Sequence, residues 1–180
     1  MSGVNEHPGN RRIDRIRDGM YTADLGTLSL EDLRERRDEC LAEREYLSLL
    51  RRLVQGRAEI LRAELDARGS DEDRGPLVDR LAEILAGDEP KGGARGEAVK
   101  VGLPEEELLL ARRRVERLVA DAGISDPGAL DDERLGGAVD LLATEVREVS
   151  SARADVIRVL DVVQDELKRR YREDPTLVLT

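Results

Sequence analysis

Two stretches of this 180-residue chain carry an apolar residue at every seventh position. In the first stretch these residues are Leu33, Cys40, Leu47, Val54 and Leu61. In the second they are Leu135, Leu142, Val149, Val156 and Val163. A repeat of this length forms an apolar stripe along one side of an α-helix, and the stripe is buried by packing against another helix. The pattern therefore predicts two long helices joined in a coiled coil.

The composition favours the same class of fold. Charged residues make up 39% of the chain and aromatic residues only 2%, with no Phe and no Trp. A β-sandwich or β-barrel would use β-branched and aromatic residues on alternating positions. We therefore predict an all-α fold, a long antiparallel two-helix coiled-coil hairpin with shorter accessory helices in the connection. The connection between the two stretches is long enough to bring the chain back in the opposite direction.

Helix starts, helix stops and Gly-rich segments divide the chain further. Ser29 is the expected N-cap of the first long helix, Gly69 follows its end, and Pro175 follows the end of the second. The expected segments are a flexible N-terminal arm (1–26), the first long helix (27–68), a short helix and Gly-rich linker (69–103), an amphipathic helix (104–123), the second long helix (128–174) and a tail (175–180).

The two long helices resemble each other beyond their apolar stripes. A shift of 102 residues aligns Ser48 with Ser150 and Arg51 with Arg153. It also aligns the beginnings of the two helices, where Gly, Leu, Glu and Leu recur at the same spacing. A coiled coil does not require these matches, so we infer that one helical unit has been duplicated.

Several classes of function are excluded by what the chain lacks. The single Cys (Cys40) and single His (His7) cannot form a disulfide, a zinc finger or a Cys/His nucleophilic pair within one chain. There is no Gly-rich phosphate loop and no cluster of metal ligands, so an enzyme is the weakest interpretation. No apolar run is long enough to span a membrane and no signal peptide opens the chain, which favours a cytoplasmic protein without membrane contact.

The net charge of −10 argues against direct binding of nucleic acid. It favours a basic protein partner instead.

A row of polar residues lies beside the apolar stripe of the first helix. At about 100° per residue it consists of Arg44, Ser48, Arg51, Gln55 and Glu59. The second helix repeats it as Val146, Ser150, Arg153, Ile157 and Asp161. Arginine can bind a phosphate or the edge of a guanine through two parallel hydrogen bonds, and a carboxylate can accept from the guanine N–H groups. The alternative is that these residues are an ordinary solvated flank of a coiled coil.

The segment REYLSLLRRLVQGRAEILRAEL, from Arg44 to Leu65, resembles the first signature helix of the RsiG anti-sigma family, also known as aerial mycelium formation proteins. The family signature, E-x3-S-x2-R-x3-Q-x3-D, occurs once on each of two long helices. The ending KRRYRE, from Lys168 to Glu173, also resembles the family. The resemblance implies an antiparallel hairpin that holds a WhiG-like sigma factor inactive with cyclic di-GMP bound across the signature helices.

The resemblance implies a set of residues for cyclic di-GMP, namely Arg44, Ser48, Arg51, Gln55, Glu59, Ser150, Arg153 and Asp161. The chain departs from the signature in both copies. Arg44 and Glu59 stand where the first copy of the family has Glu and Asp, and Val146 and Ile157 stand where the second copy has Glu and Gln.

For the partner we expect apolar anchors on the amphipathic helix, among them Leu109, Leu110 and Leu118. The alternative function is a nucleotide-independent anti-sigma factor or a coiled-coil adaptor or scaffold.

Overall fold

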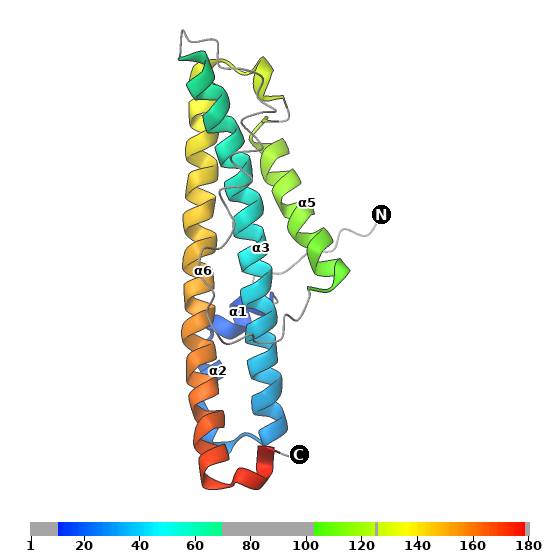
Figure 1. Ribbon diagram of the computed structural model, residues 1–180, viewed down its shortest axis with the longest axis vertical. Helices are drawn as coiled ribbons and strands as arrows, with labels where there is room; N and C mark the ends of the chain where they lie inside the picture. The colour runs from blue at the N-terminus through cyan, green and yellow to red at the C-terminus, as the bar shows by residue number, and fades with distance from the viewer. Residues whose placement is uncertain (1–10, 70–102, 125, 179–180) are drawn as a thin grey trace. The chain divides into compact units, whose positions relative to one another are not determined.

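The computed structural model describes residues 11–69, 103–124 and 126–178, and all secondary structure within these ranges is helical (Figure 1). In chain order the elements are α1 (Arg12–Arg17), α2 (Met20–Ala23), η1 (Leu25–Thr27), α3 (Leu30–Arg68), α5 (Glu105–Asp121), η2 (Pro127–Ala129), α6 (Asp132–Glu173) and η3 (Pro175–Val178). The η elements are short 3₁₀ turns. The prediction of an all-α fold with two long helices is confirmed.

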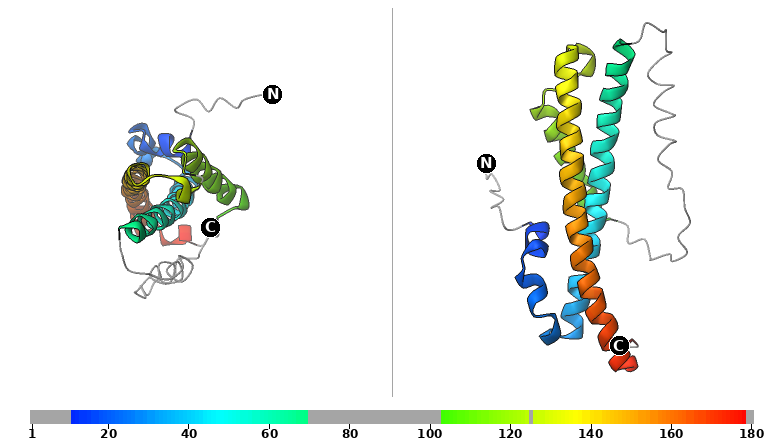
Figure 2. Two further views of the ribbon diagram at one scale, coloured as in Figure 1. Left: turned by 90° about the horizontal axis from the view of Figure 1, so that it is seen from above. Right: turned by 90° about the vertical axis from the view of Figure 1, so that its left-hand side faces the viewer.

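The chain forms two compact units, and each long helix contributes a segment to both. The first unit comprises Met1–Ser48 and Ser150–Thr180, and the second comprises Leu49–Val149. Within the first unit, Arg34 Nε donates a hydrogen bond to the Tyr171 hydroxyl at 3.1 Å. Within the second, Arg68 Nη1 donates to the Leu130 carbonyl at 2.6 Å. In the first unit the beginning of α3 thus meets the end of α6, and in the second the end of α3 meets the turn before α6, which is the antiparallel arrangement predicted (Figure 2).

The apolar stripes form the core of both units. All ten residues of the two seven-residue repeats have an exposed fraction of 3% or less. In the first unit, Leu33, Val163 and Leu167 pack together with Leu25, which lies in the turn before α3. Burial of each Leu or Val contributes about 1.5–3 kcal/mol, so the paired stripes are the main source of stability.

Both long helices begin at a residue that caps them. Ser29 Oγ accepts a hydrogen bond from the Asp32 N–H at 3.0 Å, and the Asp32 carboxylate accepts from the Ser29 N–H at 3.3 Å. At the start of α6, Asp131 Oδ1 accepts from the Arg134 N–H at 2.8 Å. These bonds satisfy N–H groups that have no partner inside a helix. Ser29 and Asp131 are 102 residues apart, so the two caps are equivalent positions of the duplicated unit.

The prediction of a flexible arm over residues 1–26 is wrong where the structure describes it. Residues 12–27 form α1, α2 and η1, and Ile16 is only 1% exposed. Arg12 binds the buried Glu43 of α3 (Nε to Oε2, 2.5 Å), which offsets the cost of burying that carboxylate. Residues 1–10 lie outside the described part of the chain, as do residues 70–102 of the expected linker.

In the second unit, α5 takes the place that α1 has in the first. Ala111 and Val115 are buried, and Arg114 Nη2 pairs with Glu145 Oε1 of α6 at 2.9 Å. Gly123 ends the helix with a positive φ of 66°, a conformation that glycine adopts without strain. None of the described helices is both long enough and apolar enough to cross a membrane.

Candidate functional site

The predicted polar residues of the first unit meet at one contact between the two long helices. Arg153 Nε of α6 donates to Ser48 Oγ of α3 at 2.8 Å. The Ser48 hydroxyl in turn donates to the Arg44 carbonyl, one helical turn earlier, at 2.7 Å. Ser48 and Arg153 are both half-buried. The two sequence copies therefore contribute a serine and an arginine, respectively, to the same contact.

The predicted residues of the second unit form a row on α3. Gln55 Nε2 donates to Glu59 Oε1 at 2.9 Å, and Arg51 Nη1 lies 3.5 Å from Gln55 Oε1. All three side chains are half-buried. The row therefore presents a cation, an amide and a carboxylate along successive turns, with the amide linking the two charged groups.

The remaining predicted site residues are Arg44, Ser150 and Asp161. The Arg44 guanidinium pairs with its neighbour Glu45 at 2.8 Å. Asp161 is exposed, and Ser150 is half-buried on α6. The structure thus joins Ser48 to Arg153 and links Arg51, Gln55 and Glu59, while Arg44 and Asp161 stand apart from both groups.

Arg51 and Arg153, which the 102-residue shift aligns, share an electrostatic property. Among the described residues, Arg153 bonds only to the Ser48 hydroxyl and Arg51 only to the Gln55 amide. Neither guanidinium is neutralised by a carboxylate within that part of the chain. A half-buried guanidinium with neutral partners keeps both its charge and several N–H donors for an anion such as a phosphate.

The duplication also includes two arginines near the ends of α3 and α6, Arg68 and Arg170, which we call the arginine anchors. Their contacts are not among those predicted from the sequence. Arg68, at the end of α3, donates to the carbonyls of Leu130 at 2.6 Å and Pro127 at 3.0 Å, and pairs with Glu64 at 3.0 Å. Arg170, near the end of α6, makes the equivalent contacts. It donates to the carbonyls of Leu28 at 2.6 Å and Leu25 at 2.8 Å, and pairs with Glu166 at 2.9 Å.

Arg68 and Arg170 are 102 residues apart. Their partners are spaced in the same way, namely Glu64 and Glu166, Leu28 and Leu130, and Leu25 and Pro127. Hydrogen bonds from Arg169 and Arg170 lower the pKa of Glu166 to about 2, so this carboxylate stays ionised. Extending the 102-residue shift to these positions would have revealed the anchors in the sequence.

The same shift explains the unexpected α1. The residues RIDRI of Arg12–Ile16 align with RVERL of Arg114–Leu118 in α5. The ion pairs match as well, since Arg12 binds Glu43 and Arg114 binds Glu145. This alignment was the sequence signal for α1.

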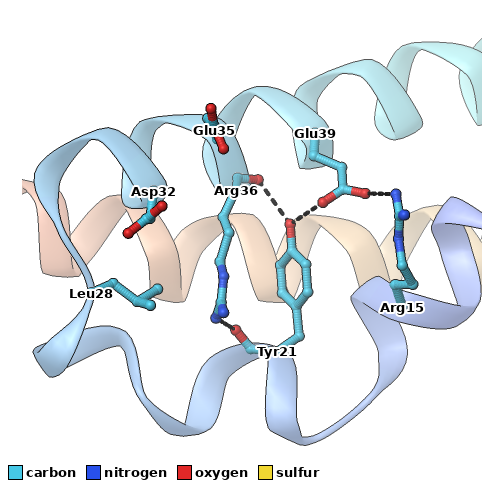
Figure 3. Close-up of a pocket in the computed structure, with 7 residues that line it drawn as sticks. All are labelled: Arg15, Tyr21, Leu28, Asp32, Glu35, Arg36 and Glu39. Atoms are coloured by element: carbon cyan, nitrogen blue, oxygen red, sulfur yellow. Dashed lines mark hydrogen bonds and ion pairs between the residues drawn. The ribbon is translucent and has the colours of Figure 1, made fainter.

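A hollow of about 620 Å³ lies between the N-terminal elements and α3 (Figure 3). Its lining residues are Arg15, Tyr21, Leu28, Asp32, Glu35, Arg36 and Glu39. The Tyr21 hydroxyl lies 2.9 Å from Glu39 Oε2, and Glu39 also pairs with Arg15. Arg36 donates to the Tyr21 carbonyl. The hollow is therefore crossed by bonds within the protein that hold α1 and α2 against α3.

Two groups near this hollow, the Tyr21 hydroxyl and the Cys40 thiol, stay protonated at neutral pH. Burial, with the neighbouring Cys40 and Glu39, raises the pKa of Tyr21 above its ordinary value. Burial also raises the pKa of the Cys40 thiol to about 11. Among the described residues, no group of three or more His, Cys, Asp or Glu side chains could hold a metal ion.

The predicted partner anchors differ in exposure. Leu109 and Leu110 are 42% and 51% exposed, and Leu118 is half-buried. Leu118 lines a second hollow, of about 360 Å³, together with residues of α6.

Comparison with known proteins identifies part of the chain. Residues 19–85 match the model of a family described as RsiG-like. The matched range contains the whole of α3, including its polar row, and supports the resemblance to the RsiG family that residues 44–65 show. The match indicates an anti-sigma factor role. No curated protein matches the chain.

Proposed function

We propose that this protein is an anti-sigma factor that sequesters a WhiG-like sigma factor, with cyclic di-GMP bound by the polar residues of α3 and α6. The family match supports the anti-sigma role, because it covers the helix that carries the first copy of the signature. An anti-sigma factor needs no catalytic group. It needs a surface that covers what RNA polymerase or the promoter would otherwise contact.

The ligand proposal rests on the burial and the hydrogen-bond partners of Arg51 and Arg153. Arg51 and Arg153 are half-buried and bond only to neutral polar groups within the described part of the chain. Cyclic di-GMP carries two phosphate charges per molecule, and an acidic protein must neutralise them locally. Charged hydrogen bonds between arginine and phosphate supply that neutralisation.

The carboxylates of Glu59 and Asp161 would bind the guanine bases of the ligand. Glu59 accepts from Gln55 and retains a second oxygen, while Asp161 is exposed. Either carboxylate can accept hydrogen bonds from guanine N–H groups. Gln55, which links Arg51 to Glu59, can turn its amide to the ligand when the ligand replaces one of these contacts.

A nucleotide-independent anti-sigma factor or a coiled-coil adaptor is the second candidate, favoured by a different observation. Arg44 pairs with Glu45 instead of extending the polar row. In the second copy, the side chains of Val146 and Ile157 cannot hydrogen-bond at all. Each hydrogen bond that a charged ligand loses costs about 1.5–3 kcal/mol, so these substitutions reduce nucleotide affinity relative to a complete signature.

Calorimetric titration with cyclic di-GMP separates the two candidates. We expect the wild-type chain to bind the nucleotide, and the double variant Arg51→Ala/Arg153→Ala to bind it about a hundredfold more weakly, because each substitution removes a charged hydrogen bond. The matched control is Arg52→Ala/Arg158→Ala, which removes two exposed arginines from the same helices and should bind within twofold of the wild type.

Titration with a purified WhiG-like sigma factor completes the test. We expect binding that becomes tighter when cyclic di-GMP is present. Binding of the sigma factor with no heat from the nucleotide would support the nucleotide-independent candidate. Absence of sigma binding under both conditions would contradict the proposed function.

A further inference from the structure

The hollow between α5 and α6 in the second unit is an apolar groove with an acidic edge. It is lined by Leu118 of α5 and by Gly137, Asp140, Leu141, Thr144, Glu145 and Glu148 of α6. Leu141 is 44% exposed, which is unusual for a residue of its size on a helix that already has a buried stripe. The lining therefore offers two leucines to a ligand that can bury them.

The hollow of the first unit shares two of these positions, since the counterparts of Gly137 and Leu141 are Glu35 and Glu39. In the first unit the counterpart of Leu141 is Glu39, which pairs with Arg15 and bonds to the Tyr21 hydroxyl (Figure 3). In the second unit the counterpart of Arg15 is Arg117, which is exposed, and the counterpart of Tyr21 is Gly123. An arginine cannot form an ion pair with a leucine, so the contacts that cross the first hollow have no equivalent in the second.

Gly137 adds an independent reason to expect an occupant. A Cβ atom at this position would meet nothing within 4 Å, so packing in the folded chain does not require glycine there. Glycine inside a helix is nevertheless unfavourable relative to alanine. A glycine in the lining of a groove lets another backbone approach the helix closely.

The charges around the groove specify the kind of occupant. Asp140 and Glu148 are exposed, and neither side chain has a partner among the described residues. Glu145 is already paired with Arg114. The two free carboxylates lie two helical turns apart on α6, with Leu141 between them. They complement lysine or arginine side chains that flank an apolar residue on a partner helix.

We propose that the α5–α6 groove docks an amphipathic helix of the sigma factor. An apolar side chain of that helix packs on Leu118 and Leu141, and basic side chains on either side of it pair with Asp140 and Glu148. Gly137 permits the close approach of the docked backbone. This inference rests on the proposed function and assigns its partner surface to one groove.

The first test compares two exposed apolar residues of α6. Leu141 lies in the groove and Val162, which is 49% exposed, lies outside it. We expect Leu141→Asp to weaken binding of a purified WhiG-like sigma factor at least tenfold, and Val162→Asp to leave the affinity within twofold of wild type. Both side chains are exposed, so circular dichroism should show the same helix content and the same melting temperature for the two variants.

A second pair of variants tests whether the backbone of the docked helix approaches α6 closely at Gly137. Gly136 and Gly137 are neighbours in α6 with open space around both, but only Gly137 lines the groove. We expect Gly136→Ala and Gly137→Ala to raise the melting temperature alike, because alanine favours the helix. Only Gly137→Ala should reduce the sigma affinity, by at least threefold.

The outcomes distinguish failure of this inference from failure of the proposed function. If the wild type binds the sigma factor and Leu141→Asp binds it equally well, the groove assignment is wrong and the anti-sigma function stands. If the wild type does not bind the sigma factor, both are wrong. If Leu141→Asp turns a wild-type dimer into a monomer in sedimentation and leaves the sigma affinity unchanged, the groove joins two copies of this chain and the proposal is overturned.

Discussion

At the scale of single residues, the structure is held at the helix ends by two equivalent arginines. Arg68 donates to three backbone carbonyls and Arg170 to two, in each case in the turn that precedes the other long helix. The Pro127 and Leu25 carbonyls also accept a hydrogen bond from the Leu130 and Leu28 N–H groups, so each arginine adds to the backbone bonds of its turn. Each arginine is also held by a glutamate one helical turn earlier, Glu64 or Glu166.

Replacing either anchor by alanine should destabilise the fold. We expect Arg170→Ala to lower the free energy of unfolding by about 2 kcal/mol, because it removes charged hydrogen bonds to carbonyl groups, and Arg68→Ala to lower it for the same reason. The control is Arg172→Ala, an exposed residue of the last turn of α6, which should cost less than about 0.5 kcal/mol. Urea unfolding followed by circular dichroism measures all three. Equal costs for Arg172 and the two anchors would show that the carbonyl contacts do not stabilise the turns.

The residue-level contacts of the candidate site could be predicted only in part. The helical repeat places Ser48 and Arg153 in their own polar rows, which is correct. The contact between them depends on how each helix is rotated about its axis, and the apolar stripe fixes that rotation only approximately. Arg44 was expected in the row because of its position, yet its long side chain reaches Glu45 instead.

At the scale of elements, the seven-residue stripes determine how the long helices pair. Val156 and Val162 both lie on α6 in the first unit, and they differ in their surroundings. Val156 is fully buried in the stripe, whereas Val162 is 49% exposed. The pair therefore separates the effect of the stripe from the effect of placing an aspartate in the helix.

We expect Val156→Asp to lower the free energy of unfolding by more than about 3 kcal/mol, because it loses a buried valine and places a charge in an apolar layer. Val162→Asp should cost less than about 1 kcal/mol. Chemical denaturation of the two variants checks this prediction. Similar stabilities for the two variants would mean that the stripe is not the core.

Long and short elements differed in how well the sequence predicts them. The stripes of α3 and α6 extend over many turns, so their periodicity is unambiguous. The six-residue α1 and the four-residue α2 are too short to show periodicity, and the mixture of Gly, Asn, Pro and balanced charges over residues 1–26 predicts an arm instead. Their contacts with α3 form only in the folded chain, through pairs such as Arg12 with Glu43 that lie 31 positions apart.

At the scale of the whole molecule, one duplicated unit carries two different surfaces. The caps, the turns and the arginine anchors are the same in both halves, since they maintain the fold. The surfaces around them have diverged. In the first half Arg15, Tyr21 and Glu39 bond to one another along the hollow, and in the second half Leu141 is exposed.

The central claim is that this protein inhibits a sigma factor, and run-off transcription tests it most directly. RNA polymerase core enzyme, a WhiG-like sigma factor and a promoter specific for that sigma factor are incubated with increasing amounts of the chain, in the presence of cyclic di-GMP. We expect the specific transcript to fall in proportion to the chain added and to vanish near equimolar chain and sigma factor, while transcription by the principal sigma factor is unchanged. An undiminished specific transcript at a tenfold excess of the folded chain would contradict the account.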